Sequence, residues 1–160
     1  MQLKGSAARV QAALDQAGLA LTVREFPAST RTAQDAADAI GCPVAAIAKS
    51  LIFRAKQSDR PVLIVASGAN RVDEKRVAQH LGEALGRADA AFVREKTGFA
   101  IGGVPPCGHT TPPVVFLDED LFELDEIWAA AGTPNAVFRL TAEALKALTL
   151  GEVIRIKPAQ

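Results

Sequence analysis

The chain has 160 residues, of which 49% are hydrophobic, enough for one compact domain with a real core. Its 18 basic residues balance its 18 acidic ones and only 5% of residues are aromatic, which argues against a protein that holds nucleic acid by a strong positive field or by base stacking. No apolar run reaches membrane-spanning length, the N-terminus does not resemble a signal peptide, and the two cysteines have no metal or redox spacing, so we expect a cytoplasmic protein with reduced thiols.

Helix and strand patterns alternate along the chain without a linker or repeat, which predicts a single domain over residues 1–160. The first half reads as a helix over 6–17, a strand over 19–26 and a helix over 33–40 that Thr32 caps. A helical turn at 44–48 precedes strands at 48–54 and 62–66, joined by a hairpin-like segment. The second of these strands is apolar at every position, which predicts burial on both faces.

The second half continues the alternation. The predicted elements are a helix over 73–81, strands over 90–93 and 113–117, a helix over 120–131, a strand over 136–140, a helix over 141–148 and a strand over 153–156. Strands outnumber those of a simple βαβ alternation. We therefore expect a mixed α+β fold, in which a curled mixed β-sheet approaches a barrel and is surrounded by helices.

Residues 98–109 form a segment rich in glycine and proline between two apolar segments. Paired glycines allow positive φ and close approach to a ligand, whereas the two prolines stiffen the chain and remove their own N–H groups. The remaining amide donors would converge on a carbonyl oxygen or an anion; they belong to Gly102, Gly103, Val104, Cys107 and Gly108. An ordinary tight turn is the alternative interpretation.

Lys49 begins a strand face that it shares with Leu51 and Phe53, which mark this face as inward. An unpaired buried ammonium is costly, so this lysine must reach a rim or meet an anion. The two interpretations are a rim lysine paired with a carboxylate and a cation at the mouth of a pocket.

Four other candidate residues lie in the glycine-rich segment or in a later turn. His109 fits a general base, a hydrogen-bond donor or a turn residue, and Cys107 fits a small apolar loop residue or a nucleophile. A metal site from these two and His80 has too few ligands. Thr133 and Asn135 occupy a turn that reaches the pocket wall if the next strand pairs near the glycine-rich segment.

Three segments together resemble the YbaK / prolyl-tRNA synthetase-associated editing domain family, over nearly the whole chain. These are 48–53 with its lysine, 97–108 with its Gly-x-x-x-Pro loop, and the apolar strand that follows with its acid-rich continuation. The resemblance implies a mixed, barrel-like sheet wrapped by helices. It also implies a free-standing deacylase that hydrolyses the ester of mischarged tRNA, most often tRNA for proline.

The resemblance further implies roles for individual residues. The amides of Gly102 and Gly103 would hold the aminoacyl carbonyl or the terminal ribose, and Lys49 would contact the phosphate or ribose of the terminal adenosine. Water is the implied nucleophile, without a metal, a cofactor or a covalent intermediate. Further substrate-binding candidates are Phe26, Thr32, Ile101, Val104, Pro105, Pro106, Cys107, Gly108, His109, Thr133 and Asn135.

The expected partner is the 3′ aminoacyl-adenosine end of a mischarged tRNA, with or without a docked prolyl-tRNA synthetase, and neither a membrane nor duplex DNA. The cysteine-removing branch has a serine and an aspartate near 130–137 that this chain does not match, so we expect a small neutral amino acid such as alanine, serine or threonine. The alternative function is a non-catalytic module that binds a nucleotide or small metabolite in the same pocket. A DNA-binding regulator and a metal hydrolase using Cys107 and His109 are further alternatives.

Overall fold

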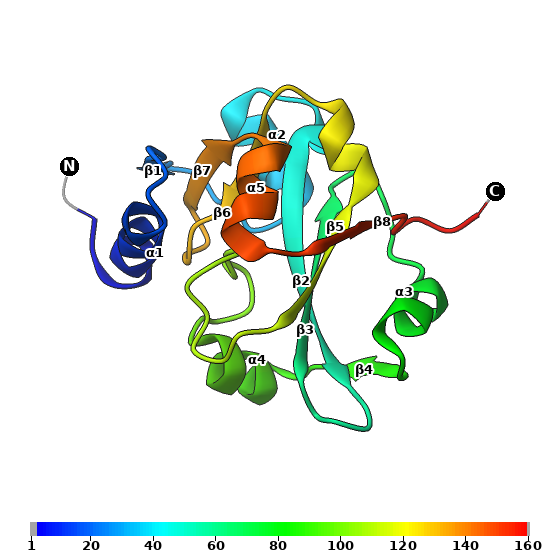
Figure 1. The fold of residues 1–160 in the computed structure, drawn as a ribbon. Helices are drawn as coiled ribbons and strands as arrows, with labels where there is room; N and C mark the ends of the chain where they lie inside the picture. Colours follow the sequence, from blue (N-terminus) through cyan, green and yellow to red (C-terminus); the bar gives the residue numbers. More distant parts are fainter. Residues whose placement is uncertain (1–2, 160) are drawn as a thin grey trace.

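A mixed β-sheet of eight strands runs through the computed structural model, which describes residues 3–159 (Figure 1). The strands are β1 (Val23–Glu25), β2 (Ile47–Ala55), β3 (Pro61–Ser67), β4 (Leu85–Arg87), β5 (Val114–Asp118), β6 (Ile127–Ala130), β7 (Ala136–Leu140) and β8 (Glu152–Ile154). Their order is β1-β7-β6-β2-β3-β5-β8, and β4 pairs with β2 beside this path. The path ends at β1 and β8, so the sheet does not close into a barrel.

Helices lie on several sides of this sheet, as predicted (Figure 1). They are α1 (Gly5–Gln16), α2 (Ala33–Ile40), α3 (Glu74–Leu81), α4 (Ala90–Thr97) and α5 (Ala142–Thr149), with 3₁₀ turns η1 (Val44–Ala46) and η2 (Glu119–Glu123). The Thr32 side chain caps α2 by accepting a hydrogen bond from the Asp35 amide, as its sequence position predicts. No helix of residues 3–159 is long and apolar enough to cross a membrane.

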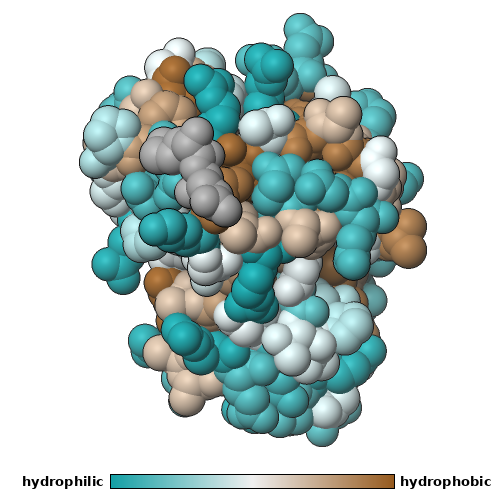
Figure 2. All heavy atoms as spheres, turned by 90° about the vertical axis from the view of Figure 1, so that its left-hand side faces the viewer, coloured by the Kyte–Doolittle hydropathy of each residue, from teal (hydrophilic) through white to brown (hydrophobic). Residues whose placement is uncertain are grey.

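The core has apolar side chains on both faces of the central strand β3. Residues 62–66 are fully buried, which confirms the prediction from their sequence. Leu63 and Val65 join the larger cluster with Phe99 and Phe138, whereas Val62 and Ile64 face a second cluster. The face that carries α1 and β1 is mostly hydrophilic, with hydrophobic residues in several separate groups between hydrophilic ones (Figure 2).

β2 is the strand that positions the site, because its neighbours leave a gap. Along nearly its whole length it pairs with β3 in antiparallel register. On its other edge, Ile47 and Ala48 pair with β6, and residues from Phe53 to Ala55 pair with β4. Residues 49–52 therefore have a neighbouring strand on one side only.

Two predicted elements are wrong. The predicted strand over 90–93 is the beginning of α4, which the Asp89 carboxylate caps by accepting from the Phe92 amide. The predicted helix over 120–131 is η2 followed by β6, because Ile127 and Trp128 pair with β7 rather than continuing a helix. The strand β4 was not predicted, and β1 and β8 are shorter than or offset from their predicted ranges.

Candidate active site

A pocket of about 480 Å³ lies at the gap beside β2. Its walls come from the segment before α2 and that helix (Thr30, Arg31, Thr32, Ala33, Ala36), from β2 (Ile47, Ala48, Lys49, Ser50, Leu51, Ile52, Phe53), from Ala88 and Val93, from the glycine-rich loop (Ile101, Gly102, Gly103, Val104), and from Trp128, Ala129, Ala130 and Val137. Strands distant in sequence thus meet around one cavity. Most of its wall is apolar, and many of the side chains are as small as alanine.

Three lining residues of the glycine-rich loop have backbone amides without a hydrogen-bond acceptor in the described part of the chain. The amides of Gly102, Gly103 and Val104 donate no hydrogen bond to any group within residues 3–159. Gly103 and Val104 are buried, so leaving their N–H groups without an acceptor carries a cost unless a ligand supplies one. Gly102 has a φ of 99°, a conformation that glycine adopts freely.

A neighbouring turn holds the loop in place. The Gly132 amide donates to the Gly103 carbonyl at 2.8 Å. A Cβ on Gly103 would lie 2.9 Å from the backbone of Thr133, so only glycine fits there. The Asn135 side chain in turn donates to the Phe26 carbonyl at 2.9 Å, and Thr133 Oγ1 donates to Asn135 Oδ1 at 3.1 Å.

Lys49 faces the same pocket from β2. Leu51 and Phe53 share its face, as predicted, but all three side chains are only half-buried because this part of β2 borders the gap. Partial burial lowers the pKa of Lys49 from its usual value, and the carboxylate of Asp118 opposes this shift. No ion pair involves Lys49 within the described residues, and Asp118 instead accepts hydrogen bonds from Ser67, Asn70 and Asp120.

The unpaired edge of β2 adds further polar groups. The Ile47 carbonyl and the Ala55 amide both bond toward the β3 side of the strand. Because the bonding direction alternates along a strand, Ser50 turns its own amide and carbonyl toward the gap. The Ser50 hydroxyl is buried and has no hydrogen-bond partner in the described part of the chain.

A family model, the aminoacyl-tRNA editing domain, matches residues 27–148. The chain belongs to this family. Both the Lys49 strand and the glycine-rich loop lie within the matched range.

One curated protein and two solved structures align over most of the chain. The protein YwhH of Bacillus subtilis (strain 168), which is uncharacterized, is 37% identical over 131 residues, covering 82% of this chain and 83% of that protein. A crystal structure of a candidate trans-editing enzyme for prolyl-tRNA synthetase is 48% identical, with a TM-score of 0.93 over 99% of this chain and 100% of that one. The hypothetical protein APE2540 is 25% identical, with a TM-score of 0.86 over 92% of this chain and 98% of its own.

The structure brings six of the predicted site residues of this editing domain into the pocket wall: Lys49, Gly102, Gly103, Thr32, Ile101 and Val104. Ile101 is 51% exposed, which places it at the rim rather than in the depth. The other predicted residues do not line the pocket; they are Phe26, Pro105, Pro106, Cys107, Gly108, His109, Thr133 and Asn135.

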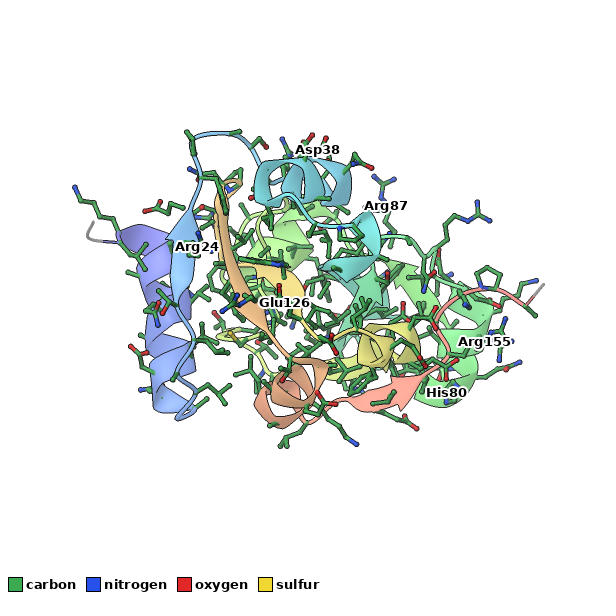
Figure 3. The ribbon with its side chains drawn as sticks, turned by 90° about the horizontal axis from the view of Figure 1, so that it is seen from above. Arg24, Asp38, His80, Arg87, Glu126 and Arg155 are labelled. Atoms are coloured by element: carbon green, nitrogen blue, oxygen red, sulfur yellow. The ribbon has the colours of Figure 1, made fainter. Side chains whose placement is uncertain are left out.

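Those other residues contact the elements that form the pocket wall or lie away from the pocket. Thr133 and Asn135 hold the glycine-rich loop and Phe26, as described above. The Phe26 ring lies 5.8 Å from the guanidinium carbon of Arg24, which also lies 5.7 Å from the ring of Trp128. Figure 3 shows Arg24 on β1, next to α1. The predicted contact of Phe26 with substrate therefore has no support in this arrangement.

His109 and Cys107 pack inside the protein beside the loop and do not line the pocket. The Nε2 atom of His109 lies 2.7 Å from the Pro105 carbonyl oxygen, and the imidazole packs against Phe99. Burial lowers the pKa of His109, while the hydrogen bond to Pro105 works against that shift. Burial raises the pKa of the Cys107 thiol to about 12, so it is protonated and a poor nucleophile at neutral pH.

Sequence reasoning missed several residues of the wall, including Thr30, Arg31 and Ser50. Thr30 and Arg31 directly precede the predicted helix cap Thr32, and Ser50 directly follows Lys49. Their closeness in sequence to these predicted site residues is the one feature that could have indicated a place in the pocket wall. No group of three histidine, cysteine, aspartate or glutamate side chains within residues 3–159 is placed to hold a metal ion.

Proposed function

We propose that this protein is a free-standing aminoacyl-tRNA deacylase, which hydrolyses the ester between a small non-cognate amino acid and the 3′ end of tRNA. The observation that carries the proposal is that Gly102, Gly103 and Val104, whose amides have no acceptor within residues 3–159, line the same pocket as Lys49. Membership of the aminoacyl-tRNA editing domain family supports the substrate class.

The proposed reaction is the hydrolysis of an activated ester. Water adds to the aminoacyl carbonyl carbon, the bond from this carbon to the ribose oxygen breaks, and a proton passes to that oxygen, releasing the free amino acid and a tRNA with its terminal hydroxyl restored. The negative charge that develops on the carbonyl oxygen would be stabilised by the amides of Gly102, Gly103 and Val104. A donor placed for the transition state contributes about 3–4 kcal/mol, so two or three such donors suffice for a large acceleration.

The wall has no histidine, cysteine, aspartate or glutamate that could act as a general base. In our proposal the attacking water is therefore oriented by the site, and the neighbouring ribose hydroxyl of the substrate relays the proton. Lys49 would contact the ribose or phosphate side of the terminal adenosine, and neither a metal nor a covalent intermediate takes part.

The lining of the pocket supports a small amino acid as the group removed. Ala33, Ala36, Ala129 and Ala130 keep the wall smooth and apolar, with room for a short side chain beside the ribose. A pocket of this kind separates side chains by only about 1–3 kcal/mol per methylene, which favours a set of small substrates over a single one. We propose alanine, serine or threonine carried by tRNA for proline, and action in the cytoplasm with or without a docked prolyl-tRNA synthetase.

The test is a panel of tRNAs for proline charged with different amino acids, incubated with the protein alone. We expect release of the small non-cognate amino acids and no release of proline. Lys49→Ala should slow the release by at least about 100-fold, since it removes one charged contact at the reacting end. Lys146→Ala, which removes an exposed lysine of α5 outside the pocket, is the matched control and should match the wild type.

The alternative, a non-catalytic module that binds a nucleotide or metabolite in this pocket, makes the opposite prediction. It would bind the 3′ end without releasing any amino acid. Hydrolysis that persists unchanged in Lys49→Ala would instead reject the role given to that lysine.

A further inference from the structure

Arg31 lies at the mouth of the pocket on a backbone that is held on both sides. It belongs to the segment between β1 and α2 and lines the pocket, and its side chain is exposed. Before it, the amide and hydroxyl of Thr30 donate to the Pro134 carbonyl at 2.7 and 3.1 Å. After it, Thr32 caps α2. The position of the Arg31 backbone is therefore fixed, while its side chain reaches over the pocket.

The side chain of Arg31 rests on the glycine-rich loop. A Cβ added to Gly102 would lie 2.7 Å from Arg31 Nε and 3.2 Å from Arg31 Cγ. The absence of a side chain at Gly102 thus lets the guanidinium arm lie against the loop that carries the unpaired amides. The cation and these amide donors border the same space.

No carboxylate among residues 3–159 forms an ion pair with Arg31. Within residues 3–159 the Arg31 side chain makes no hydrogen bond and no ion pair, whereas Arg54, Arg60 and Arg139 each pair with a carboxylate. Arg31 and Lys49 are the two charged residues of the pocket wall, and both are positive. Such a site favours an anionic group of its ligand and repels a cationic one.

The chemistry of an aminoacylated tRNA end identifies that anion. The carboxylate of the amino acid is consumed in the ester and its amino group is positive, so the phosphodiesters carry the only negative charges. Lys49 lies half-buried in the gap, whereas Arg31 is exposed at the mouth. We propose that Arg31 binds the phosphate on the 5′ side of the terminal adenosine, and so positions the ester against the loop amides. This inference rests on the proposed function, and it leaves Lys49 the ribose side.

The experiment compares the binding of adenosine 5′-monophosphate with that of adenosine, because the two differ by this phosphate alone. We expect the wild type to bind the monophosphate about tenfold more tightly, as a charge-assisted contact to arginine provides. Arg31→Ala should bring the two affinities close together while leaving the affinity for adenosine unchanged. Arg31→Lys should restore part of the difference, since it keeps the charge and loses the planar fork. Arg71→Ala, which removes another exposed arginine outside the pocket, should behave as the wild type.

Each other result counts against the proposal. An equal loss of affinity for both ligands in Arg31→Ala would mean a structural role, and an unchanged ratio, or no preference in the wild type, would place the phosphate elsewhere. Because binding is measured without hydrolysis, this outcome is separate from the proposed function, which fails if the wild type releases no amino acid from any charged tRNA.

Discussion

Burial decides which ionisable side chains around the glycine-rich loop can take part in chemistry. Cys107 and His109 belong to the same glycine-rich segment, but neither lines the pocket, and partial burial favours their neutral forms. Lys49 is less buried and lies in the pocket wall. At the scale of single residues, closeness to Gly102 and Gly103 in the sequence therefore did not predict which side chains line the pocket.

His109 makes a prediction about stability and pH. Its pKa in the folded protein lies below its usual value of 6.5, so the unfolded chain binds more protons than the folded one in this range. The contribution of neutral His109 is complete above pH 6.5 and is lost as the pH falls toward the folded-state pKa. We expect the free energy of unfolding, measured with urea, to fall between about pH 7.5 and about pH 5.

The variant His109→Gln keeps a donor for the Pro105 carbonyl but does not titrate, so its stability should vary less over the same range. Asp120 and Glu83 also have lowered pKa values, but they change the stability only at lower pH, since the usual pKa values of these groups are 3.8 and 4.5. An equal pH dependence in the variant and the wild type would show that His109 is not the group responsible.

At the scale of elements, the sequence predicted those helices and strands that local interactions define. Thr32 caps a helix as expected, and the uniformly apolar 62–66 segment is a buried strand. The helix prediction around Trp128 was wrong because the apolar spacing of this segment also fits a helix. The segment is a strand because it pairs with β7 and β2, and this pairing cannot be seen in the local sequence pattern. The gap beside β2 could not be predicted either, because it arises from where β4 and β6 happen to end.

The contact between the glycine-rich loop and the turn after β6 yields a prediction at this scale. In Gly103→Ala the new Cβ would meet the Thr133 backbone at 2.9 Å, and backbone cannot move aside as a side chain can. We expect a loss of stability of about 1–3 kcal/mol and, because the amides shift, a fall in hydrolysis of about 100-fold. Urea unfolding and the charged-tRNA assay measure the two effects.

Gly82→Ala provides the matched control. Its Cβ would meet nothing within 4 Å, but its φ of 87° makes alanine strained there, at a cost of about 1 kcal/mol or more. This variant should lose stability to a similar degree and keep its activity. If Gly103→Ala were as active as Gly82→Ala, the position of the loop amides would not matter for the reaction.

At the scale of the whole molecule, the site is a break in a sheet. β2 provides a strand edge without a neighbour, and the glycine-rich loop, whose amides have no acceptor within residues 3–159, lines the gap beside it. Helix α2 and the segment before it form another wall of the pocket. The balanced net charge provides no overall attraction for a polyanion, and in our proposal the cations Lys49 and Arg31 of the pocket wall attract the tRNA end locally. The family and the sheet were predictable from the spacing of motifs, whereas this assembly required the three-dimensional structure.

The most direct test of the account follows the backbone amides themselves, by NMR titration with a stable analogue in which alanine is joined to the 3′ position of adenosine through an amide. The account predicts that the amide signals of Gly102, Gly103 and Val104 shift most, and that these shifts weaken strongly in Lys49→Ala. Shifts confined to another surface, such as the groove lined by His80 and Leu150, with these three signals unmoved, would contradict it.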